Sequence, residues 1–178
     1  MATVIDGSAS VTINSGAVLG ITSGTAQAST SGTSIDFTGI PSWVKRVTVM
    51  LSAVSTSGTI VPLIQIGSGS ITSSGYISTS MYMNTASASS NVQYTTGFGI
   101  NQNVAAGAIY GAFTLSLVNS ATNTWVLNGG AANSSSAAAI NISSGGVSLG
   151  GALDRVRITT LSGVDTFDAG TVNIMYEG

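Results

Sequence analysis

Residues 47 to 153 contain no Asp, Glu, Lys, Arg or His. Glu and Lys are among the good helix formers, so their absence over this stretch argues against helices and favours β structure. A surface without charge also has little electrostatic repulsion to keep copies of a protein apart. The stretch therefore indicates membership of an ordered assembly. The alternative is a secreted or surface protein with a neutral coat.

The overall composition is that of a folded protein. Hydrophobic residues make up 43% of the 178 residues, but charged residues make up only 6%, where about 25% is usual. Disorder normally combines low hydrophobicity with high net charge, and this chain has neither. Four basic residues and a net charge of −2 cannot neutralise a row of phosphates, so we expect no nucleic-acid partner.

The residue types that carry most catalytic and metal chemistry are missing. With no cysteine and no histidine, the chain can form neither a disulfide nor a Ser-His-Asp or Cys-His arrangement, nor a zinc site based on these residues. The glycine pairs at 67–69 and 97–99 lack a helix and a P-loop lysine after them. We therefore expect no enzyme activity, no cofactor and no metal.

Neither a signal peptide nor a membrane span is predicted. The first residues lack a basic region and place Asp6 where an apolar core would run. The longest apolar stretch, 108–118, is interrupted by polar residues and is too short to span a bilayer. We expect a protein made without a signal peptide and without a membrane partner.

Alternation of apolar and polar residues predicts strands at 11–13, 47–51, 156–159 and 171–176. Between the strand candidates lie clusters of Gly, Ser, Thr and Asn, which are typical of turns. About ten to twelve strand candidates separated by such turns predict an all-β sandwich or barrel. We expect a β-sandwich body over 34–178 and a short N-terminal β arm, or assembly segment, over 1–33. Residues 67–92 suit a long surface connection or an edge hairpin.

Two acids near the C-terminus are the remaining candidates for catalysis. Asp165 and Asp168 lie three residues apart, with Asp154 nearby, and a glycosidase needs two carboxyl groups facing each other across a sugar. Because Arg155 and Arg157 lie in the same region, ion pairing and turn capping are simpler explanations. Calcium binding by the same oxygens is a further alternative.

The charged residues gather in two short regions. Asp36, Lys45 and Arg46 lie in the first. The second region contains Asp154, Arg155, Arg157, Asp165 and Asp168. We predict that these charges pair across neighbouring strands or across a subunit boundary. Surface pairs contribute only about 0–1 kcal/mol each, so their use would be in fixing register or the choice of partner.

Aromatic side chains are the candidates for glycan binding, because an exposed ring can stack on the face of a sugar. Trp43 and Trp125 lie among β-branched and aliphatic neighbours, which predicts core packing for both. The tyrosines Tyr76, Tyr82 and Tyr94 are the candidate glycan contacts if they are exposed. If they are buried, they are ordinary sandwich residues.

Two blocks of the chain resemble a known module. Residues 35–51 (Ile35 to Leu51) and the ending 153–177, with the piece 94–99 (Tyr-Thr-Thr-Gly-Phe-Gly) between them, resemble a module of tailed-bacteriophage structural proteins. The resemblance covers 34–66 and 153–177 well and the middle loosely. It implies a jelly-roll-like β-sandwich displayed on the virion as a homotrimer, and it carries over no catalytic residues.

From this resemblance we expect a bacteriophage virion structural protein, made in the host cytoplasm. It would act by self-association and by docking onto other virion proteins, such as the major capsid or tail proteins. Because we expect the 178 residues to be the complete chain, without a long shaft, a capsid decoration (cement) protein and a small tail or fibre component are both open. The alternatives are a glycan-binding receptor-recognition module and, less favoured, a polysaccharide hydrolase.

Overall fold

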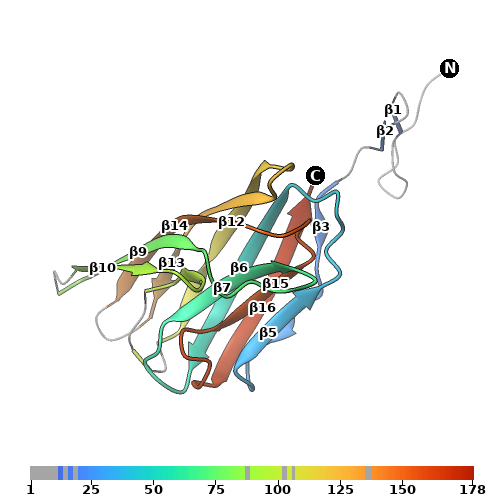
Figure 1. Ribbon diagram of the computed structural model, residues 1–178. Coiled ribbons are helices and arrows are strands. Elements are labelled where there is room, and N and C mark those ends of the chain that lie inside the picture. Colours follow the sequence, from blue (N-terminus) through green and yellow to red (C-terminus); the bar gives the residue numbers. More distant parts are fainter. Residues whose placement is uncertain are drawn as a thin grey trace.

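Two antiparallel sheets packed face to face account for most of the described chain (Figure 1). The computed structural model describes residues 12–13, 16–17, 20–86, 89–101, 104–105, 107–134 and 138–178. Over these residues the secondary structure is all strand, with no helix. The prediction of an all-β sandwich is confirmed. The jelly-roll connectivity stays a prediction.

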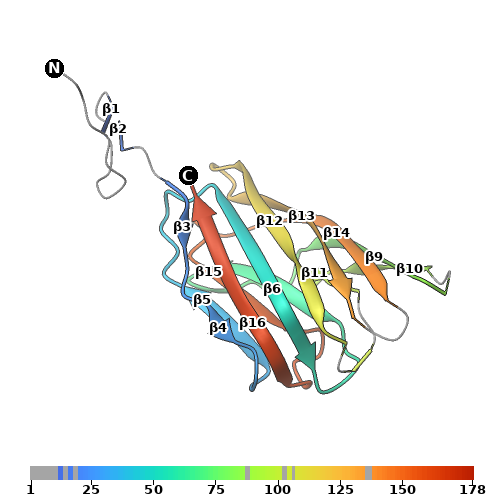
Figure 2. The ribbon, with the colours of Figure 1, turned by 180° about the vertical axis from the view of Figure 1, so that it is seen from behind.

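The larger sheet has nine strands in the order β10-β9-β14-β13-β12-β6-β16-β3, with β4 also pairing with β16. These strands are β3 (Thr22–Ser23), β4 (Gln27–Ala28), β6 (Arg46–Thr56), β9 (Ile77–Asn84), β10 (Ser89–Tyr94), β12 (Ile109–Asn119), β13 (Thr124–Asn133), β14 (Ala139–Ser148) and β16 (Phe167–Glu177). Seen from behind, they form one broad surface (Figure 2).

The smaller sheet has the order β11-β7-β15-β5, with β8 beside β7. Its strands are β5 (Ser34–Thr38), β7 (Pro62–Ser68), β8 (Ser70–Ile71), β11 (Phe98–Gly99) and β15 (Arg155–Thr160). It covers one face of the larger sheet. The strands β1 (Thr12–Ile13) and β2 (Gly16–Ala17) pair with each other.

The core lies between the two sheets and follows from the alternation in the sequence. In β6 the side chains of Val47, Val49 and Leu51 point inward, and their polar neighbours point outward. Inward residues of β12, β13, β15 and β16 complete one continuous apolar cluster. Trp125 is buried in this cluster, while Trp43 packs against its margin with its ring centroid 5.9 Å from that of Tyr176.

Part of the predicted N-terminal arm lies against the body of the same chain. Strand β3 pairs with residues 175–176 of β16, and β4 pairs with residues 171–172. Gly24, between these strands, donates its backbone N–H to the Ile174 carbonyl at 2.7 Å. Residues 22–28 therefore extend the larger sheet. The boundary at residue 33 stays a prediction, and residues 1–11 lie outside the described residues.

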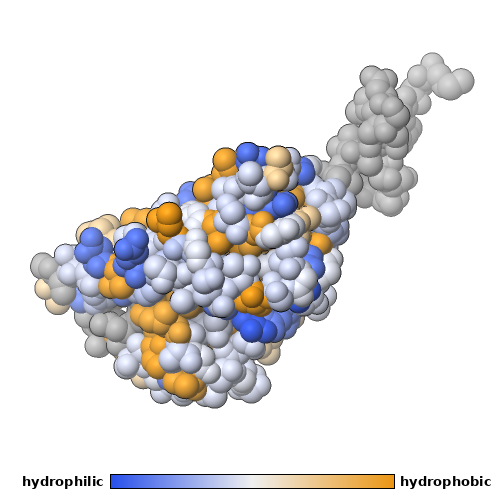
Figure 3. Space-filling model, in the orientation of Figure 1, coloured by the Kyte–Doolittle hydropathy of each residue, from blue (hydrophilic) through white to orange (hydrophobic). Residues whose placement is uncertain are grey.

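The smaller sheet carries Asp36 on β5 and Arg155 and Arg157 on the adjacent strand β15. The space-filling view of this side is mostly weakly polar, with small hydrophilic and hydrophobic areas (Figure 3). The more unusual surface is the outer face of the larger sheet, on the opposite side of the molecule.

Candidate functional site

The two candidate catalytic acids each hold a neighbouring turn. The Asp165 carboxylate accepts the backbone N–H of Ile60 at 2.9 Å, and the Ser55 hydroxyl donates to the Asp168 carboxylate. Both carboxylates are thus used in local hydrogen bonds. Because these hydrogen bonds lead to separate partners, they do not give the facing carboxylate pair that a glycosidase requires.

Asp154 fixes the turn between β7 and β8. Its carboxylate accepts the Gly69 N–H at 3.1 Å and pairs with Arg155 at 2.7 Å. The hydrogen bond from Arg155 lowers the pKa of Asp154 below its usual value. Because the pKa of Asp154 is lower in the folded state than in the unfolded state, ionised Asp154 stabilises the fold at neutral pH. This stabilisation is lost as the pH falls through the folded-state pKa.

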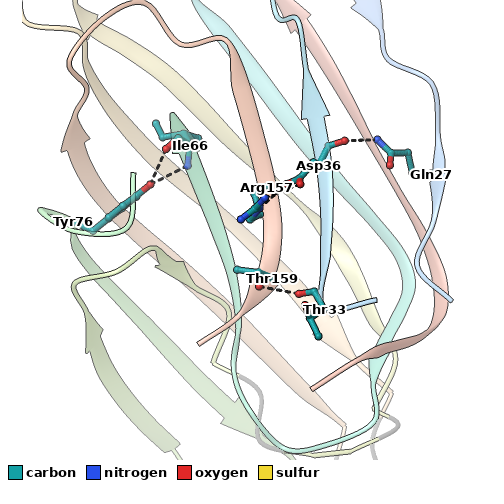
Figure 4. Close-up of polar contacts among 7 residues, drawn as sticks. All are labelled: Gln27, Thr33, Asp36, Ile66, Tyr76, Arg157 and Thr159. Atoms are coloured by element: carbon teal, nitrogen blue, oxygen red, sulfur yellow. Dashed lines mark hydrogen bonds and ion pairs between the residues drawn. The ribbon is translucent and has the colours of Figure 1, made fainter. Parts of the chain in front are cut away.

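Two further ion pairs connect strands that are distant in the sequence. Asp36 and Arg157 are directly opposite in β5 and β15, and the guanidinium donates two hydrogen bonds, at 2.6 and 2.8 Å, to the carboxylate (Figure 4). Arg46 and Glu177 are likewise opposite in β6 and β16, with their closest atoms 2.7 Å apart. The backbone N–H of Lys45 donates to the Glu177 carbonyl. These pairs can fix strand register, and their use at a subunit boundary stays a prediction.

Exchanging the charges of the Asp36–Arg157 pair tests its role in register. We expect Asp36→Arg alone to destabilise the fold by about 1 kcal/mol, because like charges then face each other across β5 and β15. The double variant Asp36→Arg with Arg157→Asp should recover most of that loss. Urea unfolding at low and at high salt measures both effects. Equal stability of the single and double variants would show that the pair does not matter.

Two of the three candidate glycan contacts are core residues. Tyr76 is 2% exposed and Tyr94 is 4% exposed, so neither ring is available to stack on a sugar. Of the two alternatives left open by the sequence, Tyr76 and Tyr94 are the buried sandwich residues and not the glycan contacts. Tyr82 is half-buried, and its hydroxyl accepts a hydrogen bond from the Asn84 amide. Tyr110, on β12, is the tyrosine with an exposed ring on the outer face.

The Tyr76 hydroxyl closes a gap in the hydrogen bonding of β7. It accepts the Ile66 N–H at 2.9 Å and donates toward the Ile66 carbonyl at 3.3 Å (Figure 4). It also donates toward the Thr72 carbonyl at 3.0 Å. The ring packs edge-on against Phe98, with centroids 5.0 Å apart. Since Tyr76 follows a Ser-rich turn in the sequence, its local surroundings left both exposure and burial open. The signal that sequence reasoning missed is that this turn folds back onto β7.

Burial raises the pKa of Tyr76 to about 12, from an ordinary value of 10.0. The pKa of Tyr76 is therefore higher in the folded state than in the unfolded state. The protonated hydroxyl contributes fully to the free energy of unfolding below pH 10, and this contribution is lost as the pH rises toward 12. We expect a loss of about 2 to 3 kcal/mol over that window. In Tyr76→Phe the loss should be smaller, although the variant starts less stable because the Ile66 N–H has lost its partner. Urea unfolding at several alkaline pH values, with Tyr110→Phe at an exposed position as the control, makes this comparison.

Strands β9 and β14 present their apolar sides to solvent. In β14 the outward residues Ile140 and Ile142 are about half exposed, at 51% and 50%, while Asn141 and Ser143 between them are buried. In β9 the outward apolar residues are Ile77, Met81 and Met83, with Thr79 between them, and the buried residues are Ser78 and Ser80. The usual arrangement of a half-buried strand is the reverse, with apolar side chains inside. This inversion is the most unusual feature of the molecule.

The polar side chains that these strands bury are only partly satisfied. The Ser143 hydroxyl donates to the Gly99 carbonyl at 2.5 Å, and the Ser80 hydroxyl accepts the Asn101 N–H at 3.0 Å. Asn141 is fully buried, and neither its amide nitrogen nor its amide oxygen has a hydrogen-bond partner. Burying an unpaired polar group is costly, so the inversion is not explained by stabilisation of the isolated chain.

Cross-strand register places the outward apolar side chains in two adjacent rows. The first row runs across β9, β14, β13 and β12, and the second continues onto β6. In the first row lie Met83, Ile140, Ala132 and Tyr110, and in the second lie Met81, Ile142, Gly130, Ala112 and Met50. We call this surface the outer apolar face. It contains no charged residue, because it falls within the charge-free stretch.

No protein-family model matches the chain, and neither a curated protein nor a solved structure was found that matches it. Within the described residues there is no group of three or more His, Cys, Asp or Glu placed to hold a metal. The same residues include no helix long and apolar enough to cross a membrane. The outer apolar face is therefore the best-supported candidate functional surface.

Proposed function

We propose that this chain is a structural protein of a bacteriophage virion, which acts by self-association and by docking onto other virion proteins. The observation that carries the proposal is the outer apolar face, an uncharged surface built from strands whose apolar residues point away from the core. Contiguous apolar patches on a soluble protein typically mark a binding surface. A binding surface without charge suits neighbours that are equally neutral.

The assignment to a virion rests on the resemblance of residues 34–66 and 153–177 to a tailed-phage structural module. Within the proposal the sandwich belongs to the jelly-roll class and assembles as a homotrimer. The protein could decorate the head of the virion, or it could belong to the tail or its fibres. These two locations differ in the number of copies per particle. Hundreds of copies belong to a head protein, and a few belong to a tail component.

The other function classes have lost support from particular residues. Tyr76 and Tyr94 are buried, so their rings cannot stack on a glycan. Asp165 and Asp168 each form hydrogen bonds to separate partners, so they do not form the facing pair of carboxylates that catalysis would need. Replacing both acids with Asn and retaining full virion assembly would agree with a structural role.

Quantitative mass spectrometry of purified virions of the encoding phage tests the proposal. We expect the chain to be present at a fixed ratio to the major capsid protein, and to stay with the particles through density-gradient purification. Particles that lack the chain, from cells that produce it, would contradict a virion role. Lysate proteins that are known not to belong to the particle serve as the control for contamination.

A further inference from the structure

We infer that the outer apolar face is covered by the same face of a second copy of this chain. The inference rests on the proposed function and deepens it by naming a surface and its partner. A contact between the same face of two copies is two-fold, so it joins copies in pairs and is separate from the contacts that would hold the proposed homotrimer together. Three properties of the face point to a second copy: its lack of charge, its relief and its size.

The lack of charge restricts the partner. A charged side chain buried against this face would find no opposite charge, and leaving a charge buried and unpaired is strongly destabilising. The partner surface must therefore be neutral over its whole area. This chain offers such a surface itself, because all its charged residues lie outside 47–153, whereas ordinary protein surfaces are rich in charge.

The relief of the face is self-complementary. On β9 and β14 the four side chains Met81, Met83, Ile140 and Ile142 form a ridge. Beside the ridge, three outward positions on β13 and β12 are small, and we call Gly130, Ala132 and Ala112 the flat strip. The exposed ring of Tyr110 borders this strip on β12. When two copies face each other, the ridge of one copy can pack on the flat strip of the other.

The uncharged surface around the face reaches the lower limit of size for a specific contact. The two apolar rows are continued along the same strands by uncharged polar positions. With these positions included, four strands spaced by about 4.8 Å and about eight residues long at about 3.4 Å per residue cover about 500 Å². Two copies together would bury about 1,000 Å², which is the lower limit for a specific interface. Stacked sheets pack in this way, with interdigitating side chains. The larger sheet would then bury both faces, one against the smaller sheet and one against the second copy.

The inverted strands agree with this arrangement. With the outer face covered, Ile140 and Ile142 become core residues of the assembly, and the polar row that includes Asn141 and Ser143 remains inside the protomer. A one-residue change of register would move the ridge into the protomer core and Asn141 to the surface. Keeping the apolar side outward is advantageous only when another surface covers it.

Cysteine cross-linking tests the contact directly, because the chain has no cysteine of its own. We would mix the full-length variants Ile142→Cys and Ala112→Cys and oxidise them mildly. A ridge-to-strip contact brings these positions within disulfide reach, so a mixed disulfide should form faster than in the control. The control mixes Leu161→Cys with Val164→Cys, two exposed positions outside the face. Cross-linking no faster than in the control would overturn the inference.

A charge on the ridge gives an independent test. Ile142 is half exposed in the single chain, so Ile142→Lys should fold, which thermal unfolding checks. Sedimentation equilibrium should show its dissociation constant raised by at least about 100-fold over the unchanged chain. Leu161→Lys should leave self-association unchanged.

Three outcomes of the sedimentation experiment would overturn the inference. The first is an unchanged chain that is monomeric at every concentration, and the second is folded Ile142→Lys that associates as the unchanged chain does. The third is a monomer that binds only another virion protein through this face. None of the three removes the chain from the virion, which the mass spectrometry of purified particles decides separately.

Discussion

Replacing Gly170 with alanine is expected to destabilise the protein by at least about 3 kcal/mol. Gly170 has a φ of +97° and lies where the register between β6 and β16 shifts. A Cβ at this position would lie 2.5 Å from the Val54 nitrogen and even closer to the Ala53 carbonyl. Because these are backbone atoms, the two central strands would have to separate. Since small domains are stable by only about 5–15 kcal/mol, much of this margin would be lost.

Gly39→Ala is the matched control for this prediction. Gly39 also has a positive φ, +74°, but a Cβ there would meet no atom within 4 Å. It should therefore show only the conformational cost, about 1 kcal/mol. Urea unfolding of both variants separates the steric effect from the conformational one. Equal losses in the two variants would contradict the close approach of β6 and β16 at Gly170.

Truncating Trp125 to alanine should cost about 3–5 kcal/mol. Its side chain is 1% exposed in the core cluster between the two sheets, and its strand neighbours are Leu117 and Val147. Removing the indole leaves a large cavity at a site where strands on both sides limit collapse. The expected result is a large fall in the urea midpoint, measured by far-ultraviolet circular dichroism.

Trp125→Phe separates the loss of volume from the loss of the indole N–H. The Trp125 Nε1 is buried without a hydrogen-bond partner, so removing it carries no hydrogen-bond cost. The phenylalanine variant should therefore lose much less stability than the alanine variant. A loss below about 1 kcal/mol for Trp125→Ala would show that the sheets do not pack over this residue.

The central strands were predictable from the sequence because their alternation agrees with their burial. The predicted runs 47–51, 156–159 and 171–176 all lie within β6, β15 and β16. Each has apolar residues on the side that meets the opposite sheet, so local pattern and tertiary packing give the same result. Residues 67–92 contain the start of the β9–β10 edge hairpin, one of the two structures considered for them.

The outer apolar face was not predictable, because alternation alone does not say which side of a strand lies inside. In β9 and β14 the period of two is clear, but the rule that apolar side chains face the core gives the wrong side for Met81 and Ile142. Only the register with neighbouring strands decides it. The sequence left the exposure of Tyr76 and Tyr94 open for a related reason, because contacts with distant strands bury them within a polar segment.

The pairing of the charged residues could be anticipated only in outline. Two clusters of charge suggested pairing, but not which residues are opposite each other. The partner of Arg157 is Asp36, and that of Arg46 is Glu177, a residue that was not among the candidates. Cross-strand register over more than a hundred residues sets both pairs, and no local signal in the sequence encodes it.

Cryo-electron microscopy of purified virions of the encoding phage tests the central claim most directly, namely that this chain is a virion component assembled through its larger sheet. The account predicts ordered copies on the particle, with the outer faces of β9 and β14 covered by those of a neighbouring copy. Copies on the particle with this face open to solvent would contradict the assembly surface. A map at sufficient resolution in which the chain is absent from both head and tail would contradict the claim as a whole.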